Sequence, residues 1–101
     1  MVYHITHKNF HEEVLHSGKP VLLDFWAPWC APCRMLSPVL EKIAEENPDI
    51  KVCKVNIDVE YDLAKQYKVI SIPTMLVMEG GEVHDKLIGV RPKDQILELF
   101  A

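Results

Sequence analysis

Two cysteines separated by two residues are the part of this sequence best able to do chemistry. Cys30 and Cys33 stand in the motif WCAPC, after the apolar run PVLLDFWA and at the start of a predicted helix over residues 30–47. The N-terminus of a helix carries partial positive charge and unpaired N–H groups, so it stabilises the thiolate that attacks disulfides. Residues three apart lie on one side of a helix, so the second thiol can reach the first. The spacing therefore predicts a dithiol that opens and closes a disulfide.

Three other roles compete for the cysteine pair. A zinc site needs four ligands, and there is no second CxxC, although Cys53 and one of five scattered histidines could complete a set. Attachment of c-type haem needs a histidine after the second cysteine, where Arg34 stands. The cysteines could also be incidental core residues, but the neighbouring Trp and Pro indicate an exposed corner between strand and helix. We favour the redox dithiol.

Asp24 is the second candidate for chemistry, because it is the only charged residue in the apolar run over residues 20–27. Burial of its carboxyl group in a central strand would raise the pKa and make it a proton acceptor. A solvated, inert carboxylate at a strand end fits the same pattern. The residues alone leave both interpretations open.

The order of the predicted elements indicates how these residues are positioned. Strands are predicted over residues 2–6, 20–27, 50–58, 74–78 and 82–88, and helices over residues 9–17, 30–47 and 60–67 and from residue 92. The long helix is expected to bury the apolar residues Met35, Leu36, Val39, Leu40, Ile43 and Ala44. Parallel strands joined through helices, ending in a hairpin at Gly80-Gly81, predict an α/β fold with a mixed sheet between helices.

Length and charge narrow the class of protein. The 101 residues suit one domain over residues 1–101, and 49% hydrophobic with 26% charged residues is ordinary globular composition. Eleven Lys and Arg against fifteen Asp and Glu give a net charge of −4, which argues against binding nucleic acid. No apolar run reaches the roughly 20 residues of a membrane helix, and polar residues occupy the place of a signal peptide's apolar stretch. We expect a soluble, cytoplasmic protein.

The chain resembles the thioredoxin family along essentially its whole length. The match comprises VLLDFWAPWCAPCRMLSPVLEKIAEE, then VNIDVE, SIPTMLVMEGGEV and the segment around Gly89, in the order and spacing of the family. The resemblance implies a thioredoxin fold, with a central mixed five-stranded sheet flanked by four helices in the order βαβαβαββα. It also implies a general thiol-disulfide oxidoreductase that reduces protein disulfides.

The resemblance assigns a role to each candidate residue. Cys30 matches the attacking nucleophile, and Cys33 matches the resolving thiol, which should be more buried and need a base. Asp24 matches that base, acting through water, and Lys54 matches a lysine near this carboxylate, although a solvated strand lysine is the simpler interpretation from sequence.

A second set of residues is implied to bind the target protein. The family proline at Pro73 is cis and packs against the dithiol. The implied contact residues are Trp29, Ala31, Pro32, Ile72, Pro73, Gly89 and Val90. Two features depart from the family pattern: Ala31 stands where glycine is most common, and Cys53 is an additional cysteine, expected to be packed or half-exposed in its strand.

The implied partners are disulfide-containing target proteins and an NADPH-dependent thioredoxin reductase that supplies electrons. No bound cofactor and no metal are expected, because the redox group is the Cys30–Cys33 disulfide itself, and we expect a monomer. Two alternatives remain. One is a dithiol oxidant or isomerase, which would normally require an oxidising compartment. The other is a module that binds a metal ion or an iron–sulfur cluster.

Overall fold

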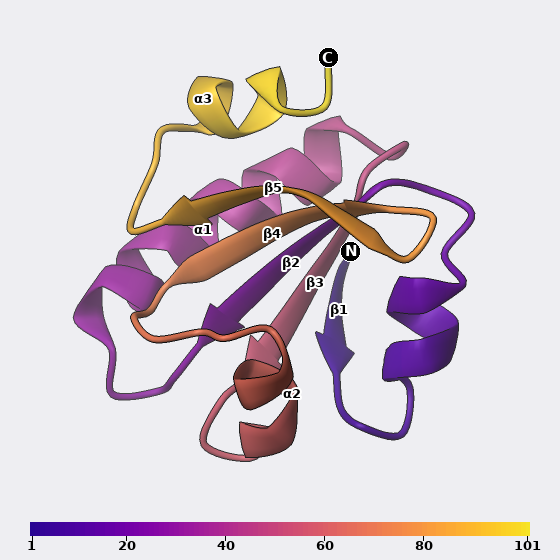
Figure 1. Ribbon diagram of the computed structural model, residues 1–101. Coiled ribbons are helices and arrows are strands. Elements are labelled where there is room, and N and C mark those ends of the chain that lie inside the picture. Colours follow the sequence, from indigo (N-terminus) through magenta and orange to yellow (C-terminus); the bar gives the residue numbers. More distant parts are fainter.

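A five-stranded mixed sheet forms the centre of the computed structural model, which describes all residues from 1 to 101 (Figure 1). The strands are β1 (Val2–Ile5), β2 (Val21–Trp26), β3 (Lys51–Asn56), β4 (Thr74–Glu79) and β5 (Glu82–Ile88), and the helical segments are η1 (His11–Leu15), α1 (Ala31–Glu46), α2 (Tyr61–Gln66) and α3 (Lys93–Glu98). The spatial order is β1-β3-β2-β4-β5. β1, β3 and β2 are parallel, whereas β4 runs antiparallel to β2 and to β5. The predicted order of elements and the mixed sheet are confirmed.

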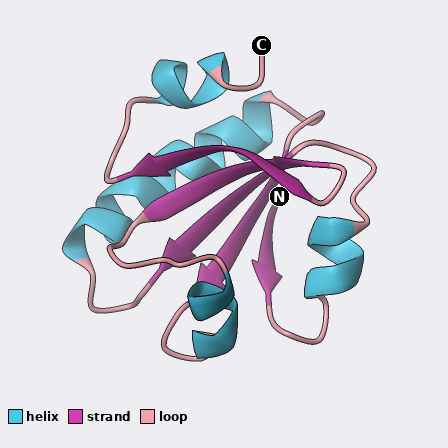
Figure 2. Cartoon of the chain, viewed as in Figure 1, coloured by secondary structure: helices cyan, strands magenta, loops and turns pink.

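Helices cover both faces of the sheet (Figure 2). On one face, Val14 of η1 and Leu63 of α2 pack against Phe25 and other strand residues. On the other face, Leu36 of α1 and Ile96 of α3 pack against residues that include Leu22. β2 is thus covered on both sides, which is why its sequence is a nearly continuous apolar run.

The alternation of side chains along β2 decides where its one charged residue points. Leu23 and Phe25 belong to the core beneath η1 and α2, whereas Leu22 belongs to the core beneath α1. Successive side chains of a strand point to opposite faces, so Asp24 lies on the same face as Leu22. The carboxyl group therefore lies between the sheet and the helix that begins at the cysteine pair.

The hairpin between β4 and β5 turns on two glycines in the left-handed region, with φ of 61° at Gly80 and 80° at Gly81. Two consecutive positive φ angles match the twist of the flanking strands, and glycine adopts them at little cost. A Cβ atom at Gly81 would also lie 3.2 Å from the backbone oxygen of Leu15. The turn therefore packs directly on the end of η1.

Three details differ from the predictions. Met35 was expected in the core and is 67% exposed, because it is about 100° around the helix from its buried neighbour Leu36. The third strand ends at Asn56 rather than residue 58, since the Asn56 side chain accepts a hydrogen bond from the Asp58 N–H (3.0 Å) and turns the chain. The first helical segment is a short π-helical turn. No helix is long and apolar enough to cross a membrane.

Candidate active site

The cysteine pair lies at the N-terminus of α1, as predicted. Cys30 is the residue that caps the helix, and a disulfide joins it to Cys33 with 5.3 Å between the two Cα atoms. The backbone N–H of Cys33 donates a hydrogen bond to Cys30 Sγ (3.2 Å). Since this N–H has no partner within the helix, the sulfur occupies the place of the usual Ser or Asp oxygen cap. The same donor would stabilise a negative charge on Cys30 in the reduced protein.

Both sulfur-bearing residues are enclosed, with Cys30 5% and Cys33 3% exposed. They form a small cluster with Ala27, against which Trp26 and Ile72 pack. Cys33 was expected to be more buried than Cys30, and the observed difference in exposure is small. None of the cavities in the structure is lined by either cysteine, so the pair is not at the bottom of a small-molecule pocket.

Asp24 is fully buried, and neither carboxyl oxygen has a hydrogen-bond partner. Loss of solvation raises the pKa of Asp24 to about 7, although the positive charge of Lys54 lowers the pKa in part. The solvated carboxylate at a strand end, which the sequence left open, is wrong: the residue is within β2, paired with Lys54 on β3 and Met75 on β4. A carboxyl group with this pKa can take up or release a proton near neutral pH.

Lys54 lies beside Asp24 in the parallel register of β2 and β3. Its ammonium group donates a hydrogen bond to Ser37 Oγ on α1 (3.2 Å) and lies 4.7 Å from the centre of the Trp26 ring. No ion pair joins Lys54 to Asp24. Lys54 is thus half-buried and fixed between a helix and an aromatic ring, unlike the freely solvated lysine that the sequence also allowed.

Trp29 stands directly before Cys30 and is 66% exposed, so it is a surface residue and not a core residue. Its indole N–H donates to the carboxylate of Asp58, with 3.0 Å to Oδ2. This bond fixes the ring beside the disulfide. Ala31 and Pro32, in the first turn of α1, are also exposed.

Two loops from elsewhere in the chain complete the surroundings of Cys30. The Ile72–Pro73 peptide bond is cis, and the Ile72 carbonyl oxygen lies 3.8 Å from Cys30 Sγ. The N–H of Gly89 donates to the Pro73 carbonyl (2.9 Å), and Gly89 has a φ of 92°. The Ile72 backbone thus lies beside the disulfide, and Gly89 is joined to the buried Pro73 that follows Ile72.

Two residues that support the site were missed by the sequence analysis. Ser37 holds Lys54, and Asp58 holds Trp29. Ser37 is four residues after Cys33, which places it on the same face of the helix, and this spacing was the available signal. Nothing in the sequence near Asp58 indicated a contact with a residue 29 positions earlier.

Cys53 takes no part in this arrangement. It is fully buried on the face of the sheet beneath η1 and α2, opposite to Asp24. Burial raises the pKa of its thiol to about 12, so the thiol stays protonated at neutral pH. Of the two environments expected for it, the packed one is correct. No group of three or more His, Cys, Asp or Glu side chains is placed to hold a metal ion.

Comparison with known proteins gives one consistent result. The model of the thioredoxin family matches residues 1–101. The chain is 43% identical over 99 residues to a thioredoxin of Rickettsia bellii, covering 97% of this chain and 94% of the relative. It is 49% identical over 90 residues to thioredoxin 1 of a Nostoc species, covering 88% of this chain and 84% of the relative.

A third relative is named both as a thioredoxin reductase and as a thioredoxin. The bifunctional thioredoxin reductase/thioredoxin of Mycobacterium leprae is 43% identical over 94 residues, which is 92% of this chain and 20% of that protein. With the cysteine motif at a helix N-terminus and the family match along the whole chain, one conclusion follows. The chain belongs to the thioredoxin family of thiol-disulfide oxidoreductases, and Cys30 and Cys33 are its redox-active pair.

Proposed function

We propose that this protein-disulfide reductase attacks target disulfides with Cys30 and releases the products with Cys33. The observation that carries the assignment is the hydrogen bond from the Cys33 N–H to Cys30 Sγ. The donor lowers the energy of a thiolate on Cys30 and does nothing comparable for Cys33, whose side chain receives no such bond. Cys30 is therefore the better nucleophile.

The reaction proceeds in two exchange steps. The Cys30 thiolate attacks one sulfur of a target disulfide, which forms a mixed disulfide and expels the other target sulfur as a thiolate. Cys33 then loses its proton, and its thiolate attacks Cys30 Sγ, so the second target sulfur leaves. The target gains two electrons and two protons, and the chain is left with the Cys30–Cys33 disulfide.

Asp24 is the proposed acceptor of the Cys33 proton, acting through water. Its carboxyl group is on the face of the sheet that α1 covers, and its pKa of about 7 allows it to be ionised in part at neutral pH. Lys54 is a positioning residue, because its charge keeps the pKa of Asp24 from rising further. Without that charge, Asp24 would hold its own proton more tightly and accept another group's proton less well.

The target is proposed to dock on the exposed residues around Cys30. Trp29, Ala31 and Pro32 provide one side of this surface. Val90, which is 39% exposed, and the partly exposed Ile72 and Gly89 provide the other. Pro73 is buried and shapes this side through its cis bond to Ile72 and its hydrogen bond to Gly89. An extended segment of the target can pair with the backbone at Ile72, since the following proline has no N–H to complete a strand ladder. An open surface with no enclosing cavity suits a macromolecular substrate.

Electrons are proposed to come from a thioredoxin reductase that uses NADPH. The fusion of both names in the Mycobacterium leprae relative supports this pairing. We propose further that residues 1–101 act as one monomeric domain in the cytoplasm, where thiols are kept reduced. Light scattering on a sizing column and cell fractionation would test the last two points.

Single cysteine variants test the two roles directly. Cys30→Ser should abolish reduction of insulin disulfides, whereas Cys33→Ser should retain the first step and accumulate a mixed disulfide with the target, visible by mass spectrometry. Cys53→Ala is the matched control and should keep most of the activity, because Cys53 is buried away from the site. Accumulation of the mixed disulfide in Cys30→Ser instead would reverse the assignment.

A further inference from the structure

Two histidine rings lie against each other on the surface, away from the dithiol. The ring centres of His11 and His16 are 4.3 Å apart, with 45° between the ring planes. Both residues are exposed. In Figure 1 the first helical segment lies beyond β1, far from the start of α1, so this pair is separate from the redox site.

The π-helical form of η1 is the reason that these rings meet. The N–H of His16 donates to the carbonyl of His11 (3.0 Å), so the hydrogen bond spans five residues. This wider turn places residues five apart one above the other, whereas an ordinary α-helix does so for residues three or four apart. The backbone therefore holds the two imidazoles side by side.

The ring nitrogens of both residues are free to take a ligand. Neither side chain makes a hydrogen bond or an ion pair, unlike His7, whose Nδ1 contacts Glu60. The charges nearby are also favourable to a cation. Glu12 and Glu13 belong to the same turn; Glu13 and Lys51 neutralise each other in an ion pair, which leaves the negative charge of Glu12.

We propose that His11 and His16 together bind a divalent transition-metal ion of the class that prefers imidazole, such as Zn²⁺, Ni²⁺ or Cu²⁺. Metal–nitrogen bonds of about 2.0–2.1 Å place two ring centres roughly 4.5 Å apart at the right angles of tetragonal Ni²⁺ or Cu²⁺, and roughly 5.2 Å apart at the tetrahedral angle of Zn²⁺. The observed 4.3 Å needs only a small movement of exposed side chains. No third protein ligand completes the set, so water fills the remaining positions.

Zinc titration of the oxidised protein at pH 7.5 tests this site, because the disulfide removes Cys30 and Cys33 as ligands and Cys53 is buried. Calorimetry should show one Zn²⁺ per chain, and NMR should show shifts confined to residues 11–16. His11→Gln and His16→Gln should each weaken binding at least tenfold. His84→Gln, which removes an exposed histidine on β5, should leave the affinity unchanged.

Two results would overturn the site. The first is an affinity of the unaltered protein weaker than millimolar. The second is an equal loss of affinity in His11→Gln and His84→Gln, which would mean that histidines bind the metal singly. A further readout is thermal unfolding: saturating Zn²⁺ should raise the midpoint of the unaltered protein and not that of His11→Gln. These measurements need no disulfide exchange, so they stand or fall independently of the proposed function.

Discussion

The buried carboxyl group of Asp24 makes the free energy of unfolding depend on pH. Its pKa is about 7 in the folded chain, against the usual 3.8 when the chain is unfolded. Between these values the folded protein holds a proton that the unfolded chain has lost. The free energy of unfolding therefore falls as the pH rises through this window, by up to about 1.4 kcal/mol for each pH unit.

Asp24→Asn should remove this dependence. We expect the variant to match the original protein near pH 4 and to exceed it by about 2–4 kcal/mol at pH 8, because no charge has to be buried. Urea unfolding between pH 4 and 9 measures the difference, and insulin reduction should slow at the same time. Asp49→Asn, which changes an exposed carboxyl group, is the control. Parallel pH profiles for the original protein and Asp24→Asn would contradict the role of burial.

The two ends of the short helix α2 each contain a residue whose contribution to stability can be tested. At its C-terminal end, the N–H of Val69 donates to the carbonyl of Ala64 (2.9 Å), which closes the helix. Lys68 between them has a φ of 55°, a conformation that favours glycine. The Cβ atom of Lys68 therefore strains the backbone at this position, and the Lys68 side chain is exposed.

Replacing Lys68 by glycine should relieve that strain. We expect Lys68→Gly to raise the free energy of unfolding by about 0.5–1 kcal/mol, after the greater flexibility of glycine in the unfolded chain is counted. Lys68→Ala removes the same charge and keeps the Cβ atom, so it should give no gain. Chemical denaturation of the three proteins decides the matter, and an equal effect of both variants would locate the cause in the charge.

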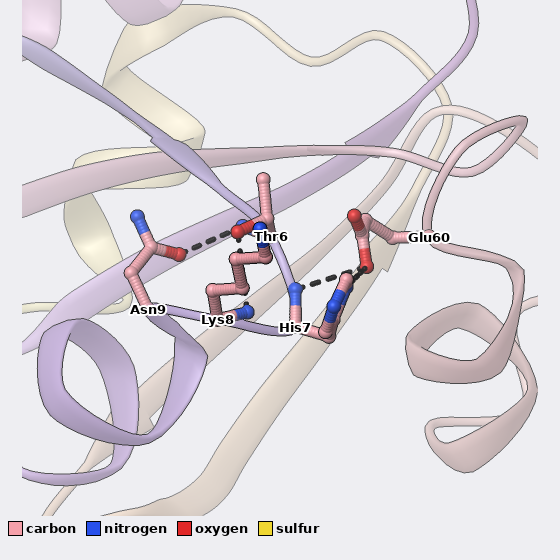
Figure 3. A network of polar contacts seen from close by, with 5 residues as sticks. All are labelled: Thr6, His7, Lys8, Asn9 and Glu60. Atoms are coloured by element: carbon pink, nitrogen blue, oxygen red, sulfur yellow. Dashed lines mark hydrogen bonds and ion pairs between the residues drawn. The ribbon is translucent and has the colours of Figure 1, made fainter.

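At the N-terminal end of α2, the buried carboxylate of Glu60 ties this helix to the loop after β1 (Figure 3). It accepts hydrogen bonds from the backbone N–H of His7 (2.9 Å) and from His7 Nδ1 (3.1 Å). Thr6 and Asn9 hold the same loop, since the Thr6 N–H donates to the Asn9 side chain (2.7 Å). Glu60 is thus a link between two segments distant in the sequence.

Glu60→Ala should lower the free energy of unfolding by about 1–3 kcal/mol, because a partly buried N–H loses its partner. His7→Ala keeps the backbone N–H and its bond to Glu60, so it should cost less than half as much. Hydrogen exchange at the His7 amide gives a local readout and should accelerate only in Glu60→Ala. Equal losses of stability would show that the imidazole contact dominates.

Over the whole molecule, the features that the sequence predicted well are those with local signals. The periodicity of apolar residues and the Gly and Pro punctuation predicted the order of the elements, and the CxxC spacing predicted the redox pair at a helix N-terminus. The burial of Asp24 could not be decided from its own segment, because it depends on how closely α1 covers β2. The contacts of Ser37 and Asp58 join residues 17 and 29 positions apart. The spacing from Cys33 indicated the helix face of Ser37 but not its partner, and no local pattern indicated the contact of Asp58.

The measurement that tests the central claim most directly is the pH dependence of alkylation of the reduced protein, with the modified cysteine identified by mass spectrometry. Stabilisation of a thiolate by the start of α1 predicts that Cys30 reacts first, with half-maximal rate at least one pH unit below the roughly 8.5 of an ordinary cysteine thiol. Preferential labelling of Cys33, or a Cys30 profile centred at or above the ordinary value, would contradict it.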